Sequence, residues 1–101
     1  MKIIKAISKQ IKEELHDAKK YAEDALVNKL VYPDLARTYS QLSAQEMEHV
    51  NMLHDCVMRL IKSYREEHGD PPAEMMAVYN FLHEEQLEEA ADVKRLQDLY
   101  R

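Results

Sequence analysis

The sequence predicts an all-α protein of three long helices, and three observations lead to this. The 101 residues include one Gly, three Pro and no Trp, a composition rich in helix formers and poor in turn residues. Apolar residues recur every three or four positions along most of the chain. Turn-forming residues gather at only two interior places. We therefore expect an up-down-up antiparallel bundle in which residues 1–101 form one domain.

The first predicted helix covers about residues 2 to 30. Its apolar positions have the spacing of an amphipathic helix, and they are Ile4, Ile7, Ile11, Ala18, Tyr21 and Ala25. Glu14 fills the gap in this stripe between Ile11 and Ala18. We therefore expect the Glu14 carboxylate to face inward, whereas its neighbour Glu13 falls on the lysine-rich side of the helix.

The second predicted helix runs from about residue 34 to residue 67, after the turn Tyr32-Pro33-Asp34. A loop of about 2–5 residues makes the first two helices an antiparallel hairpin. Steps of three and four define one stripe of Leu35, Tyr39, Leu42, Glu46, His49, Leu53, Cys56 and Leu60. Its central members, Glu46 and His49, are polar, and we expect both to point into the protein. Burying them is costly unless they are paired or bind a metal.

The third predicted helix extends from about residue 71 to residue 100. Gly69 is expected to end the preceding helix, and Asp70 and Pro71 are expected to cap and begin the new one. The run from residue 84 to residue 89 offers an acid on nearly every face of this helix. Its orientation toward the other two helices is therefore ambiguous.

Reflecting residue numbers about the first turn places Glu14 level with His49 and Asp17 level with Glu46. A Glu-x-x-His pair facing a Glu on the neighbouring helix is half of the ligand set of a di-iron site in a helical bundle. Carboxylates combined with neutral imidazole favour a transition metal over calcium. Glu14, Glu46 and His49 are therefore the predicted metal ligands, with iron as the first expectation and manganese or zinc as alternatives.

Two segments, IKEEL at residues 11–15 with Tyr21-Ala22 after it, and LSAQEMEH at residues 42–49, resemble the ferritin-like superfamily. The likeness is to the first half of rubrerythrins, bacterioferritins and short encapsulated ferritins, over roughly residues 5 to 60. It implies Glu14, Glu46 and His49 as metal ligands. It also implies Tyr21, two helical turns after Glu14 on the same face, as a supporting group. For a binuclear site it also implies oxidation of Fe²⁺ by oxygen or peroxide, a ferroxidase-type activity, or iron storage.

The third helix departs from the full-length ferritin-like pattern, because it follows a tight turn and carries no Glu-x-x-His pair. One chain therefore lacks the second half of the family's site. A homodimer or higher homo-oligomer would supply it by presenting the same ligands twice around a two-fold axis, as in the short encapsulated ferritins. Alternatively, Glu88 or Glu89 of the third helix would complete a smaller, mononuclear site within one chain.

Two other interpretations remain open for Glu46 and His49. The chain could be a metal-free helical interaction or assembly protein in which the pair only specifies packing, or it could hold a structural metal without turnover. A second Glu-x-x-His pair, Glu13 and His16, lies on a charged face beside lysines, where a solvated role is expected. His54 and His83 neighbour apolar residues and are expected to pack.

Bulk charge and cysteine content restrict the other classes of function. A formal net charge of −5 argues against nucleic acid or an anionic membrane as a partner. No segment approaches the roughly 20 apolar residues of a membrane span. The single cysteine, Cys56, has no intramolecular disulfide partner, which fits a reducing, cytoplasmic setting.

Overall fold

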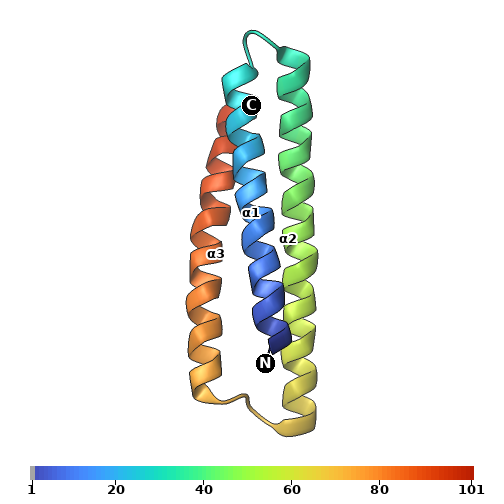
Figure 1. Ribbon diagram of the computed structural model, residues 1–101, viewed down its shortest axis with the longest axis vertical. Helices are drawn as coiled ribbons and strands as arrows, with labels where there is room; N and C mark the ends of the chain where they lie inside the picture. The colour runs from blue at the N-terminus through green and yellow to red at the C-terminus, as the bar shows by residue number, and fades with distance from the viewer. Residues whose placement is uncertain (1) are drawn as a thin grey trace.

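The computed structural model describes residues 2–101 and consists of three α-helices. They are α1 (Lys2–Asn28), α2 (Pro33–His68) and α3 (Ala73–Tyr100). They run up, down and up in a rod of 56 × 18 × 18 Å (Figure 1). The predicted all-α bundle is confirmed. None of the helices in this range is both long and apolar enough to cross a membrane.

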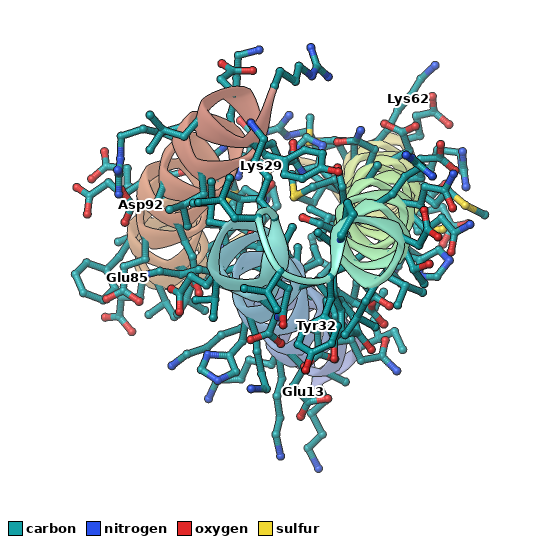
Figure 2. The ribbon with its side chains drawn as sticks, turned by 90° about the horizontal axis from the view of Figure 1, so that it is seen from above. Glu13, Lys29, Tyr32, Lys62, Glu85 and Asp92 are labelled. Atoms are coloured by element: carbon teal, nitrogen blue, oxygen red, sulfur yellow. The ribbon has the colours of Figure 1, made fainter. Side chains whose placement is uncertain are left out.

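Helix α1 is the centre of the bundle. It packs closely against both of the other helices, whereas the backbones of α2 and α3 lie farther apart and are connected mainly through side chains (Figure 1). Seen end-on, the three helices occupy the corners of a triangle (Figure 2). Helix α3 therefore covers one side of the seam between α1 and α2 and leaves the opposite side of that seam open.

The core changes character along the rod. Toward the α1–α2 turn, the buried residues of α1 and α2 are small (Ala18, Ala22, Ala25, Ala36 and Ser43), and α3 contributes the buried Val93 and Leu96. Toward the other end, larger side chains form one cluster of Ile4, Ile7, Ile11, Leu15, Val50, Val57 and Ile61. Burial of this stripe fixes the rotation of α1 and α2 about their axes. It thereby decides which neighbouring residues lie at the rim of the seam.

Ser43 connects all three helices near the middle of the small-residue half. Its fully buried hydroxyl donates a hydrogen bond to the Ala18 carbonyl of α1, at 2.7 Å. The same Oγ accepts a hydrogen bond from Nε2 of Gln97 in α3, at 2.9 Å. This bridge sets the longitudinal register of α2 against both neighbours.

The turn between α2 and α3 confirms one prediction and corrects another. Gly69 follows α2 with φ +79°, and its N–H donates to the Arg65 carbonyl at 3.0 Å. However, α3 begins at Ala73, after both prolines, and not at residue 71. Asp70 does not cap it, because its carboxylate is turned toward Arg65 Nε, 3.7 Å away. The Pro72 carbonyl accepts the first N–H bonds of the helix instead.

Candidate metal centre

Three side chains gather halfway along the α1–α2 seam: Glu14 from α1, and Glu46 and His49 from α2. One potential ligand atom from each lies within 4.8 Å of the other two. His49 Nδ1 is 3.4 Å from Glu14 Oε2 and 3.7 Å from Glu46 Oε2. Within residues 2–101, no other group of three His, Cys, Asp or Glu side chains converges in this way.

The local structure explains why these side chains meet. Glu46 and His49 are three residues apart on α2 and therefore project from the same face. Ser43 and Val50 are buried against α1, which sets the rotation of α2. On α1, burial of Leu15 fixes the rotation of the helix in the same way. Glu14, the preceding residue, therefore lies at the edge of the buried face. All three ligands consequently lie at the rim of the seam.

The side chains are less buried than the apolar stripe predicted. The exposed fractions of the Glu46, Glu14 and His49 side chains are 19%, 30% and 53%. The prediction that His49 points into the protein is therefore wrong, and Glu46 is only partly enclosed. The reason is the position of α3, which packs on the opposite side of the seam and leaves this side open to solvent.

One carboxylate oxygen of this group has no hydrogen bond. Glu46 Oε2 is shielded from solvent and makes no hydrogen bond. Among the described residues, neither Glu14 nor Glu46 forms an ion pair with a lysine or arginine, and His49 is their one basic neighbour. A shielded polar atom left unpaired costs about 1–3 kcal/mol. A cation held between the two carboxylates and the imidazole would relieve this cost, and two hard oxygens with one nitrogen suit a divalent transition metal.

The acids of α3 do not join this group. Asp92 lies 3.9 Å from Lys19, and Glu89 lines a surface hollow with Lys9 and Lys12, all on the α3 flank of α1. Figure 2 shows Glu85 and Asp92 projecting on the side of α3 that is away from α2. Glu88 is exposed. No acid of α3 therefore reaches the three ligands.

The other predicted neighbours also lie elsewhere. Asp17, expected level with Glu46, is exposed and lines a separate hollow with Glu13 and His16. Figure 2 shows Glu13 projecting away from the bundle. The second Glu-x-x-His pair is thus part of the solvated face, as predicted. Asp17 lies at the same height along α1 as the three ligands, but on a different face of that helix.

An apolar strip borders the three ligands along the seam. On α2 it consists of Leu35, Leu42, Leu53 and Leu60, all partly or largely open to solvent. Tyr21 and Tyr39 extend it, with their rings stacked at 6.1 Å. Tyr21 lies about two helical turns from Glu14. We call these six residues the seam strip.

His54 and His83 form a cross-helix contact that the sequence did not reveal. Their rings stack at 5.0 Å between α2 and α3, and Tyr79 stacks on His83 at 5.8 Å. Burial raises the pKa of the Tyr79 hydroxyl above its usual value of 10.0. The apolar neighbours of both histidines signalled packing, which the structure confirms, but the direction of α3 was needed to pair them.

Comparison of the chain with protein-family models, curated proteins and solved structures finds no match. Glu14, Glu46 and His49 are therefore the residues from which a function can be inferred.

Proposed function

We propose that this chain is a ferritin-like metal-binding protein that holds a transition-metal ion, with iron the first choice, through Glu14, Glu46 and His49. The observation that carries the proposal is the convergence of three ligand atoms within 4.8 Å around a carboxylate oxygen that has no hydrogen bond. The likeness to ferritin-like sequences supports iron, although manganese and zinc accept the same donors.

A second copy of the chain is the proposed source of the missing ligands. Three donors leave coordination positions open, and no acid of α3 reaches them. The seam strip surrounds the site with apolar side chains, including Leu35, which is 43% exposed. A dimer whose two-fold axis passes beside the site would cover both seam strips. It would also combine four carboxylates with two imidazoles. This donor set is that of a binuclear carboxylate centre in a four-helix bundle.

In such a dimer the proposed reaction is the oxidation of Fe²⁺, which is then the substrate. Two Fe²⁺ ions each release one electron, and dioxygen takes both with two protons and leaves as hydrogen peroxide. Glu14 and Glu46 contribute negative charge that stabilises the product Fe³⁺ relative to Fe²⁺. Neutral His49 contributes a nitrogen donor that keeps the ion anchored while the carboxylates change their mode of binding.

A metal-free assembly protein is the second candidate, and one observation favours it. His49 Nδ1 of α2 contacts Glu14 Oε2 of α1 directly, at 3.4 Å, and this contact links the two helices. In this case the three residues only specify packing, and the protein contains no stoichiometric metal.

Metal content separates the two candidates. Protein from iron-supplemented cells is analysed for metal per chain by mass spectrometry, alongside an E46Q/H49Q variant. The matched control is E13Q/H16Q, which removes the exposed Glu-x-x-His pair of α1. We expect the wild type and the control to carry metal and E46Q/H49Q to lose it. Metal that is near zero in all three would refute the proposed site.

Two further measurements test the reaction and the dimer. Aerobic oxidation of Fe²⁺ faster than in buffer, abolished by E46Q/H49Q, would support turnover. A metal-loaded protein that oxidises Fe²⁺ no faster than buffer would instead hold a structural ion. Sedimentation with and without Mn²⁺ tests assembly, since a dimeric site predicts that the ion increases the dimer fraction.

A further inference from the structure

A second feature lies at the end of the rod where both α1 and α3 begin. A surface cavity of about 380 Å³ opens between the first turns of these helices. Its floor and walls are mainly apolar and include Ile4, Ile61, Pro71, Met75, Val78 and Leu82. The volume falls within the range of about 300–1,000 Å³ that is typical of small-molecule sites. The cavity lies on the α3 flank of α1 and is separate from the seam.

The rim of this cavity is positively charged in a protein of net charge −5. Lys2 and Lys5 line it, and Glu74 is its one acidic lining residue. The N-terminal ends of both helices also point to this end of the rod (Figure 1). The first turn of α1 has no acidic residue, and α3 has no side-chain cap. The positive ends of the two helix dipoles therefore add to the potential of the lysines, and Glu74 in the first turn of α3 partly offsets it.

Few polar groups are available to recognise a polar ligand body. The lining contains Ser8 and Tyr79 as its neutral polar side chains. The Ser8 carbonyl already accepts a hydrogen bond from Gln86 Nε2, at 3.4 Å. The two lining methionines, Met75 and Met76, are flexible and adapt to an irregular apolar surface. The interior therefore fits an alkyl chain better than a sugar or a nucleobase.

We propose that this cavity binds the carboxylate anion of a single-chain fatty acid. The alkyl chain occupies the apolar interior, and the carboxylate lies at the rim beside Lys2 and Lys5. Charge complementarity selects this ligand, because the rim is cationic while the interior is apolar. The site is independent of the metal centre, which lies on the other flank of α1.

Dodecanoate, used below its micelle-forming concentration, is the probe, and calorimetry on the full chain measures its affinity. We expect binding of one molecule per chain, with dodecanol at least tenfold weaker because it lacks the charge. A K2Q/K5Q variant should weaken dodecanoate by about tenfold and leave dodecanol unchanged. The matched control, K9Q/K12Q, alters lysines of α1 that line a different hollow and should bind dodecanoate like the wild type.

Three results would overturn the proposal: no saturable binding of dodecanoate, equal affinity for dodecanol, or equal weakening by both lysine pairs. All four substitutions are at exposed positions, so folding of the variants is expected and circular dichroism checks it. The E46Q/H49Q variant should keep its dodecanoate affinity, and K2Q/K5Q should keep its metal content. Failure of one site is therefore distinguishable from failure of the other.

Discussion

His49 Nδ1 lies 3.4 Å from Glu14 Oε2, although the two residues are 35 positions apart in the chain. The contact exists only when α1 and α2 are packed in register, so the three ligands are assembled by folding. A metal that binds the folded chain but not the unfolded chain therefore stabilises the folded state. Metal binding and thermal stability are linked through this site.

This linkage predicts a metal-dependent melting temperature. An ion present at 100 times its dissociation constant stabilises the folded state by about 2.7 kcal/mol. We expect Mn²⁺ or Zn²⁺ to raise the melting temperature of the wild type and of E13Q/H16Q, but not that of E46Q/H49Q. The increase should shrink as the pH falls, because protons compete with the metal for the carboxylate and imidazole ligands. An equal increase in E46Q/H49Q would place the bound ion elsewhere.

Glu46→Gln tests the cost of the shielded charge. The amide removes a negative charge from a site that holds two carboxylates and leaves a neutral polar group at the shielded Oε2 position. We expect the metal-free variant to be more stable to urea by about 1 kcal/mol, while its metal-induced stabilisation is lost. Glu48→Gln, an exposed neighbour on α2, is the control and should change stability by less than about 0.5 kcal/mol. Destabilisation by Glu46→Gln alone would favour a packing role.

The sequence predicted the meeting of Glu14 and His49 because a short turn forces two long helices to run back along each other. Reflecting residue numbers about that turn predicts which residues lie at the same height along the bundle. It does not predict the side of α1 on which the third helix packs. The acidic run in α3 fits nearly every orientation, so the ambiguity of Glu88 and Glu89 was inherent in the pattern. The exposure of His49 was not predicted for the same reason, because the sequence did not show that α3 packs away from the site. Asp17 lies on another face of α1, because height alone does not specify the face of a helix.

Ser43→Ala should destabilise the bundle by about 1–3 kcal/mol, because it removes both hydrogen bonds of the buried Ser43 hydroxyl, the one to the Ala18 carbonyl and the one from Gln97. Urea denaturation measures the loss, and Ser63→Ala, at an exposed position of α2, is the matched control. A double-mutant cycle with Gln97→Ala should show coupling between the two side chains. Additive effects of the two substitutions would mean that the Ser43–Gln97 bond contributes little.

Gly69→Ala tests the turn between α2 and α3. At φ +79° and ψ −164° the backbone lies in a region that is essentially restricted to glycine. No atom lies within 4 Å of the position that a Cβ would occupy, so backbone strain is the only expected penalty. The predicted loss of unfolding free energy is about 1–3 kcal/mol. Asp70→Ala, next in the turn and exposed, should cost much less, and an equal cost would argue that the strain is relieved by local movement.

Tyr79 predicts how the bundle responds to alkaline pH. Burial raises the pKa of its hydroxyl, so the unfolded chain ionises this group first as pH rises. Stability is therefore unaffected below the ordinary tyrosine pKa of about 10 and falls as pH rises through the folded-state value. Urea unfolding at about pH 8 and about pH 11 should show a smaller alkaline loss in Tyr79→Phe than in the wild type. Tyr32→Phe, at a side chain that is 60% exposed, should lose as much as the wild type, and an equal loss in all three proteins would assign the alkaline transition to another group.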